Sequence, residues 1–143
     1  MRNTAKHQQG MMMIEALVGI LIFSFGILAM MGLQAISIKN TIEAKYRTEA
    51  SFVANKIIGE MWTECGKTCT TLSTFDTTGG TSAKMTAWRA EVAALLPGVV
   101  VNGTNSPTIQ VVGNTVTITV FWKIPGTDST IRNFSTIAQI NAS

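Results

Sequence analysis

The sequence predicts an α+β fold in which one long N-terminal helix, apolar in its first half and amphipathic in its second, packs on a small antiparallel sheet of three to four strands. Three observations predict this fold. Residues 16–38 carry no charge, residues 37–62 carry apolar side chains at helical spacing, and residues 99–140 are rich in valine, isoleucine and threonine. At 143 residues, the chain is long enough for one domain with a modest core.

The first half of the predicted helix has the length of a membrane span. At about 1.5 Å per helical residue, residues 16–38 can cross a bilayer core of about 30 Å. Glu15 lies at the start of this segment, where a carboxylate facing lipid costs about 2.5–3.5 kcal/mol, and less near the interface. Glu15 therefore either has a partner in an assembly or reaches the lipid headgroups as a boundary residue.

Three interpretations of the N-terminus compete. A secretory signal would have a shorter apolar region and a small-residue cleavage site after it, and neither is present. A plain signal anchor fits the length and the orientation but gives Glu15 no role. A leader that is cut after Gly10 would make Met11 the new N-terminus. Its free amine would then lie one helical turn from Glu15, or would meet the glutamate of a neighbouring subunit.

The segment GMMMIEALVGILIFSFGILAMMGLQ resembles the class III signal of type IV pilins and pseudopilins. It is most similar to minor pilins of the PilV type (type IV pilus modification proteins), which share an I-E-x-L-V start and a G-[IL]-L-x-x-x-G-L-Q ending. The match is specific over residues 9–34 and weakens beyond Trp62. The resemblance implies that a membrane prepilin peptidase cuts between Gly10 and Met11, that the new amine is N-methylated, and that Glu15 sets the helix register in a filament.

Two features depart from the usual pattern of the family. Met11 stands where many pilins have phenylalanine, and the apolar segment lacks the proline that major pilins often carry. Because cleavage in the family depends mainly on the glycine, we expect processing to tolerate Met11. Without a proline, the glycines of the segment are its only intrinsic weak points.

The resemblance and the charge pattern together predict the organisation of the chain. Residues 1–10 are a leader that is removed, residues 11–36 the transmembrane and filament-core half of the helix, and residues 37–143 a pilin-like domain that includes the amphipathic half. Arg2 and Lys6 precede the span, which indicates a cytoplasmic N-terminus. We expect a single-pass inner-membrane protein with a periplasmic C-terminal domain, which reaches the pilus and cell surface after assembly.

The amphipathic half should pack on the sheet through an apolar stripe and expose charged pairs on its other face. The stripe comprises Ile38, Ile42, Tyr46, Phe52, Val53, Ile57 and Met61, with Ala50 filling one gap. Three opposite-charge pairs at i,i+4 spacing should each contribute a few tenths of a kcal/mol, namely Glu43–Arg47, Lys45–Glu49 and Lys56–Glu60. We expect one helix of roughly 50 residues that ends at Gly66.

Cys65 and Cys69 follow the helix with C-x3-C spacing. In a domain outside the cytoplasm, a disulfide is the first expectation. It would close a very small loop, so its stabilisation would lie at the low end of the ~2–4 kcal/mol range. Many pilins instead have a disulfide near the C-terminus, so no functional role is carried over to this pair.

The rest of the chain is predicted to form a loop, a short helix and strands. Residues 70–82 are rich in threonine and glycine and predict a loop, and residues 83–96 predict a helix that Pro97-Gly98 ends. On this helix Trp88 should anchor the core rather than bind a ligand. The same face carries Met85, Val92 and Leu95 or Leu96.

The strands are expected in the last third of the chain. Residues 99–101 are a short candidate strand, residues 108–112 and 115–123 should form a hairpin around Gly113-Asn114, and residues 131–140 could supply a last strand. In the second strand of the hairpin, valine and isoleucine alternate with threonine, which is the period of a half-buried strand. We expect the valine and isoleucine face to meet the long helix.

Composition argues against an enzyme and against nucleic-acid binding. The net charge of +3 includes Arg2 and Lys6 of the leader, and the other charges are scattered without a basic run. The one histidine, His7, also lies in the leader. No Ser/His/Asp set, metal-ligand cluster or phosphate-binding loop can be assembled from the mature sequence, so we expect no enzyme activity, no cofactor and no metal.

The sequence therefore predicts a minor pilin that helps to initiate a type IV pilus and lies at or near its tip, contributing indirectly to adhesion, motility or DNA uptake. Its implied partners are the prepilin peptidase, other minor pilins, the major pilin, the inner-membrane assembly platform and the lipid bilayer. One alternative is a minor pseudopilin of a type II secretion system, which the Gly-Leu-Gln ending disfavours. Another is a tip receptor that binds a surface or DNA.

Overall fold

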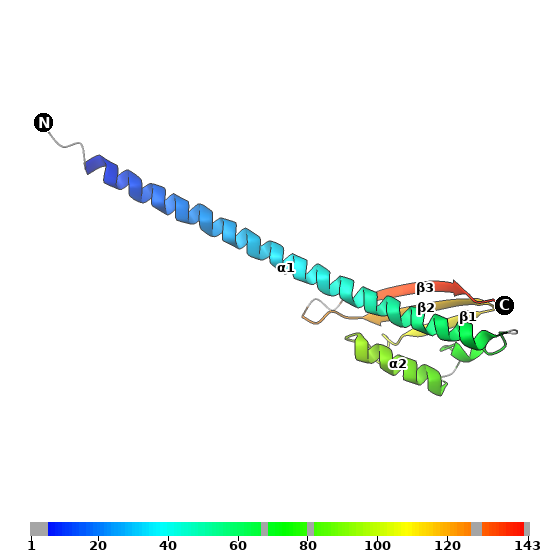
Figure 1. Ribbon diagram of the computed structural model, residues 1–143. Helices are drawn as coiled ribbons and strands as arrows, with labels where there is room; N and C mark the ends of the chain where they lie inside the picture. The colour runs from blue at the N-terminus through cyan, green and yellow to red at the C-terminus, as the bar shows by residue number, and fades with distance from the viewer. Residues whose placement is uncertain (1–5, 67–68, 80–81, 127–129, 142–143) are drawn as a thin grey trace. The chain divides into compact units, whose positions relative to one another are not determined.

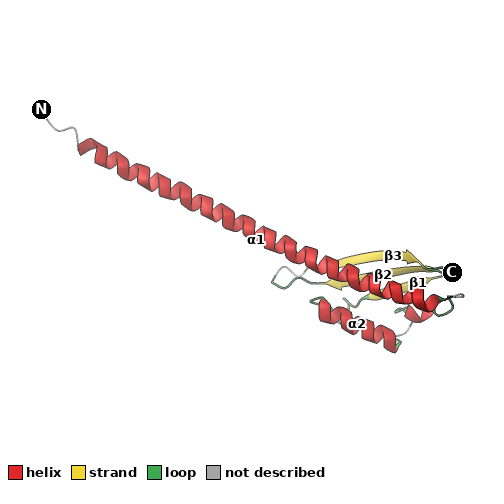
Figure 2. Cartoon of the chain, in the orientation of Figure 1, coloured by secondary structure: helices red, strands yellow, loops and turns green. Residues whose placement is uncertain are grey.

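The computed structural model describes residues 6–66, 69–79, 82–126 and 130–141. The elements in chain order are α1 (Lys6–Cys65), η1 (Leu72–Phe75), α2 (Ala83–Leu95), β1 (Thr108–Val112), β2 (Thr115–Trp122) and β3 (Arg132–Gln139) (Figure 1). The three strands form one antiparallel sheet in the order β1-β2-β3, so β1 and β3 are its edges. The predicted α+β, pilin-like architecture is confirmed, with helices and strands segregated along the chain (Figure 2).

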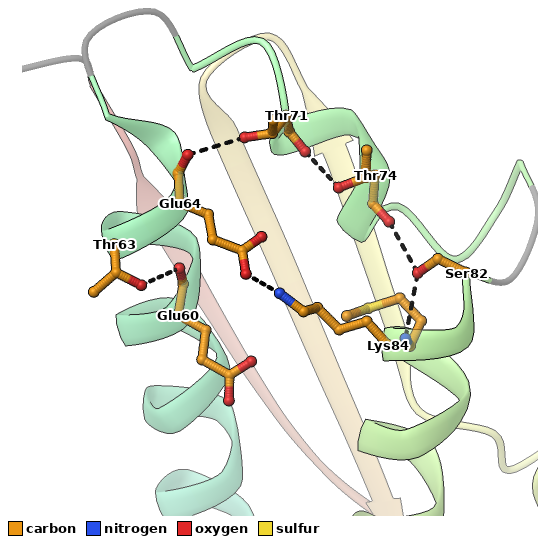
Figure 3. A network of polar contacts seen from close by, with 8 residues as sticks. Glu60, Thr63, Glu64, Thr71, Thr74, Ser82 and Lys84 are labelled. Atoms are coloured by element: carbon orange, nitrogen blue, oxygen red, sulfur yellow. Dashed lines mark hydrogen bonds and ion pairs between the residues drawn. The ribbon is translucent and has the colours of Figure 1, made fainter.

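Helix α1 is longer than expected, at 60 residues, because it begins at Lys6 within the predicted leader. It ends where the sequence predicts, since Gly66 has a φ of +50°, a left-handed conformation that glycine adopts easily after a helix. Two threonine hydroxyls bond to carbonyls in the last two turns, and of these the Glu64 carbonyl is one of the last four, which have no partner inside the helix. Thr63 Oγ1 donates to the Glu60 carbonyl at 2.8 Å, and Thr71 Oγ1 donates to the Glu64 carbonyl at 3.1 Å (Figure 3).

The described residues divide into two compact units, one up to Thr41 and one from Ile42 onward. The core of the second unit joins α1, α2 and β2. Its central members are Ala50, Val53, Ala54, Ile57 and Met61 of α1, Met85, Trp88 and Val92 of α2, and Val116, Ile118, Val120 and Trp122 of β2. Burial alternates along β2, as the Val/Ile and Thr alternation predicts. The predicted meeting of that strand face with the long helix is confirmed.

Trp88 is the core anchor that the sequence predicts. Its side chain is 4% exposed, and its indole Nε1 donates to the carbonyl of Val53 at 3.4 Å. This hydrogen bond satisfies the one polar group that burying the indole removes from water. Leu95, the last residue of α2, is 40% exposed, and Leu96, which caps the helix, is buried, so Leu96 is the one that joins the core.

The prediction that the whole stripe packs on the sheet was wrong for two of its members. Phe52 is 62% exposed and Ile38 is 61% exposed. A helix turns by about 100° per residue, so Phe52 and its neighbour Val53 cannot both lie at the centre of the face that carries Ala50. Ile38 precedes the unit that holds the core, and it shares the exposure of the apolar half of α1.

Two of the three predicted helix ion pairs were also wrong. Lys45 and Glu49 pair at 3.8 Å as expected. Glu43 pairs instead with Arg132 of β3, at 3.4 Å. Lys56 pairs with Glu91 of α2, at 2.6 Å, and this hydrogen bond raises the pKa of Lys56. Partners on packed elements replace the i,i+4 partners, whose attraction is worth only a few tenths of a kcal/mol.

The predicted strand at residues 99–101 does not form, and these residues belong to a turning segment between α2 and β1. Gly98 and Asn102 both have positive φ angles, of +75° and +66°, which extended strands do not contain. The buried side chain of Arg89 holds the segment in place, because its Nε donates to the Pro107 carbonyl at 3.1 Å. The strand propensity of three valines is overridden by these turns and by that bond.

The edge of the sheet at β1 is closed by the segment that follows η1. Thr77 N donates to the Ile109 carbonyl at 2.9 Å, and Thr77 Oγ1 accepts a hydrogen bond from Ile109 N at 2.8 Å. Asp76 Oδ2 accepts a hydrogen bond from Val111 N at 3.0 Å, and its other oxygen accepts from Thr78. The Thr78 hydroxyl, together with these backbone donors, holds the pKa of Asp76 below its ordinary value.

This arrangement predicts a stability that depends on pH. Because the pKa of Asp76 is lower in the folded chain, its stabilisation is present above the unfolded pKa of about 3.9 and is lost as pH falls through the folded value. Asp76→Asn places an amide donor where Val111 N needs an acceptor, and should cost about 1 kcal/mol at neutral pH. Urea unfolding from pH 7 to pH 3 should show the variant and the parent converging. Glu60→Gln is the control, since that carboxylate accepts no hydrogen bond from the described residues.

Candidate functional site

The residues predicted for processing and assembly lie together near the start of α1. Gly10, Met11 and Glu15 are all within the helix and all exposed. Met11 and Glu15 are therefore one turn apart on the same face, as the i,i+4 spacing requires. Glu15 makes no hydrogen bond or ion pair with any residue that the structure describes. An isolated carboxylate on an apolar helix is free to take a partner from another chain.

The chemistry of this site depends on whether the bond between Gly10 and Met11 is intact. In the uncut chain the nitrogen of Met11 is a helical amide and carries no charge. Hydrolysis of that bond would turn it into an amine that is protonated at neutral pH, since the ordinary α-amino pKa is about 7.7–8.0. The cut therefore creates a cation one turn from Glu15, and in a low-dielectric surrounding such a charge pair is strong.

The helix around the site is apolar and uncovered. Between Met11 and Ile38 the exposed large hydrophobic side chains are 40–74% exposed, and Glu15 is the only charged residue. This is the one helix in the described part of the chain that is long and apolar enough to cross a membrane, and its most apolar segment is not buried within the chain. A core helix of a soluble protein would be covered, so the segment has the properties of a membrane span.

Cys65 and Cys69 lie at disulfide-bonding distance, with Cα atoms 4.1 Å apart, so the expected pairing fits the structure. The pair joins the last residue of α1 to the segment that leads into η1. Cys69 N also donates to the Cys65 carbonyl at 2.9 Å, and Cys69 has a φ of +47°. The bond therefore fixes the turn through which the chain leaves the long helix. Residues 67–68 between them lie outside the described residues.

A polar network ties the end of α1 to η1 and α2 (Figure 3). Lys84 of α2 pairs with Glu64 of α1. Ser82 caps α2, because its Oγ accepts a hydrogen bond from Met85 N at 3.3 Å and donates to the Thr74 carbonyl at 3.4 Å. The sequence did not predict this network, although a serine before a helical pattern is a capping signal. Its hydrogen bonds and its ion pair hold the end of α1 against η1 and α2.

The structure leaves two other sequence predictions untested. In the described part of the chain, no three His, Cys, Asp or Glu side chains are grouped so that they could hold a metal ion. The loops in which a tip receptor would need an exposed patch, residues 70–82 and 125–130, include residues 80–81 and 127–129, which lie outside the described residues. The receptor alternative therefore rests on sequence alone.

Comparisons with known proteins add no relative, since no family model, no curated protein and no solved structure matches this chain.

Proposed function

We propose that this chain is a minor pilin, a low-abundance filament subunit that helps to initiate a type IV pilus and lies at or near its tip. One observation carries the proposal. A single carboxylate, Glu15, lies without a partner among the described residues on an uncovered apolar helix, one turn after the Gly10–Met11 junction. The pilin-like α+β unit, which includes the second half of the helix, supports it. A simple membrane anchor would need the apolar helix but not the carboxylate.

In this function the apolar helix holds the precursor in the inner membrane, with the leader in the cytoplasm. Prepilin peptidase cuts after Gly10, and the new amine at Met11 is methylated. The apolar helix then leaves the bilayer for the filament core, where Glu15 pairs with the amine of its own chain or of a neighbouring minor or major pilin. Because an unpaired charge in an apolar core is costly, this pair sets the axial register of each subunit that the assembly platform adds.

A pseudopilin of a type II secretion system would use the same processing and the same helix. The G-I-L-A-M-M-G-L-Q ending of the apolar segment is the feature that favours the pilus. The two systems differ in what the filament does once it is assembled. Co-purification with sheared surface pili would support the pilus, and retention in the periplasm during protein export would support the secretion system.

The first test is the mass of the intact protein recovered from its native membrane, with sequencing of its N-terminus. We expect a chain that starts at Met11 and carries one additional methyl group. A chain that starts at Met1 would be a signal-anchored protein, and the assembly role of Glu15 would have no basis. The same spectra with and without reductant would show whether Cys65 and Cys69 are joined.

Replacement of Gly10 should block processing. A Cβ at Gly10 would meet no atom within 4 Å, so Gly10→Val leaves the chain itself unaffected. Gly19→Val is the matched control, because its Cβ would also meet nothing and it lies inside the same apolar helix. We expect the first variant to accumulate as full-length precursor in the inner membrane and the second to be cut normally. Normal filament incorporation of uncut Gly10→Val would contradict the proposal.

A further inference from the structure

The two edge strands of the sheet differ in whether their outer backbone groups are hydrogen-bonded by the described residues. Asp76 and Thr77 occupy the outer hydrogen-bonding groups of β1. Within the described residues, by contrast, the backbone of β3 bonds only to β2. The strand is eight residues long, contains no proline or glycine, and carries one charge, Arg132, at its start. A long edge strand with unpaired backbone groups is a template for another strand, and proteins usually block such edges.

A groove lies beside this open edge, between β3 and the second half of α1. It has a volume of about 380 Å³ and is lined by Ala44, Arg47, Thr48, Ser51 and Phe134. The same face of α1 continues at i+7 and i+11 from Ser51 with Ile58 and Trp62, and Trp62 is 47% exposed. Ala44, Ile58, Trp62 and Phe134 supply the apolar part of this surface, and Arg47, Thr48 and Ser51 supply its polar part.

The side chains on the inner face of β3 are only partly covered by the rest of the chain. Phe134, Thr136 and Ala138 point towards the interior and are each half-buried, whereas the equivalent positions of the central strand β2 are fully buried. A strand paired to β3 would remove the remaining surface of these side chains from water. The inner face of β3 beside the groove is thus left partly uncovered by α1.

The charges around the groove select one kind of occupant. Arg47 makes no ion pair with the described residues, because Glu43 pairs with Arg132 and Glu49 pairs with Lys45. An incoming strand therefore meets an unpaired guanidinium that can bind a carboxylate. The described strands of a second copy offer Arg47 no carboxylate, since none of the three contains an acidic residue, and the β1 edge of that copy is already occupied.

We propose that the β3 edge accepts an extended segment of a different protein as a fourth strand, with an acidic side chain of that segment paired to Arg47. Backbone hydrogen bonds to β3 would supply most of the affinity, and alternate side chains packed in the groove would supply the specificity. The inference holds whether or not the chain is a pilus subunit, and its test needs no filament. Failure of this test would leave the processing and assembly of the N-terminal helix untouched.

The test uses the full chain in detergent micelles and a short labelled peptide of alternating threonine and valine with one central glutamate. Fluorescence anisotropy measures binding, and hydrogen exchange read by mass spectrometry locates it. We expect the peptide to bind and to slow exchange across residues 132–139, with β1 unchanged. The same peptide with N-methylated backbone nitrogens keeps its charge but cannot pair as a strand, so it should not bind.

Charge variants of the protein test the role of Arg47. Arg47→Glu should lower the affinity for the glutamate peptide by about five-fold, and it should raise the affinity for a matched peptide with a central lysine. Lys123→Glu makes the same change of charge at a lysine that has no ion pair with the described residues and does not line the groove, and it should leave both affinities unchanged. Equal binding of the N-methylated peptide, or no protection of β3 at saturating peptide, would overturn the proposal. Pairing of β3 with β3 of a second copy would overturn it as well.

Discussion

Glu15→Val should produce a chain that inserts in the membrane and is cut after Gly10, yet enters filaments at least about tenfold less often than the parent. The variant removes a carboxylate that has no partner among the described residues, so the chain itself should not be destabilised. In lipid it should partition better, because valine avoids the cost of a charge near the bilayer. A loss can therefore come only from the partner that Glu15 meets in an assembly. The measurement is the ratio of the protein in sheared filaments to that in the inner membrane.

Ser24→Val is the matched control for this experiment. Ser24 is the polar residue whose hydroxyl donates to the Ile20 carbonyl of the same helix at 2.7 Å, so its removal also makes the helix more apolar. It should not change filament entry. If Glu15→Val assembled as well as Ser24→Val, Glu15 would be a boundary residue that reaches the headgroups, and the proposed charge pair with Met11 would be wrong.

Phe75→Ala should lower the free energy of unfolding by about 3–5 kcal/mol, whereas Phe52→Ala should change it by no more than about 0.5 kcal/mol. The two variants make the same chemical change. Phe75 is fully buried at the end of η1, so its truncation leaves a cavity, and Phe52 is 62% exposed on α1. Urea unfolding followed by the fluorescence of the buried Trp88 and Trp122 measures both.

The comparison also decides whether the exposed face of α1 is a second packing surface. A large loss for Phe52→Ala in the isolated chain would mean that Phe52 packs within the chain after all. Equal losses for both variants would contradict the core described above. A small loss for Phe75→Ala would mean that the turn between α1 and α2 can collapse into the space that the ring leaves.

The sequence predicted those features that depend on local periodicity. The long helix follows from an uncharged segment and then an apolar stripe, its end follows from Gly66, and the buried face of β2 follows from the alternation of valine and isoleucine with threonine. Gly10, Met11 and Glu15 were found because a single carboxylate in an apolar segment is a local anomaly. Met11 and Glu15 lie on one exposed helix face, with Gly10 just before them in the same helix, and the processing and assembly roles of all three stay predictions.

Features that depend on distant partners could not be predicted in the same way. The partners of Glu43 and Lys56 are Arg132 and Glu91, which lie far along the chain and reach them only after folding. The three valines at residues 99–101 have high strand propensity, and no neighbouring residue in the sequence indicates that Arg89 holds the segment in turns. The open edge of β3 could not be seen either, because it depends on the order of the strands in the sheet.

The ion pairs that join α1 to the other elements also have a mechanical meaning. Glu43, Lys56 and Glu64 bind β3 and α2 at three levels along the helix axis. A pulling force along α1 would load all three in shear at once, together with the buried side chains from Ala50 to Met61, instead of peeling them apart one by one. Each exposed pair contributes only about 0.2–1 kcal/mol, so most of the resistance would come from the buried side chains. Under tension, the sheet and α2 should therefore separate from α1 in one step, and not by gradual fraying.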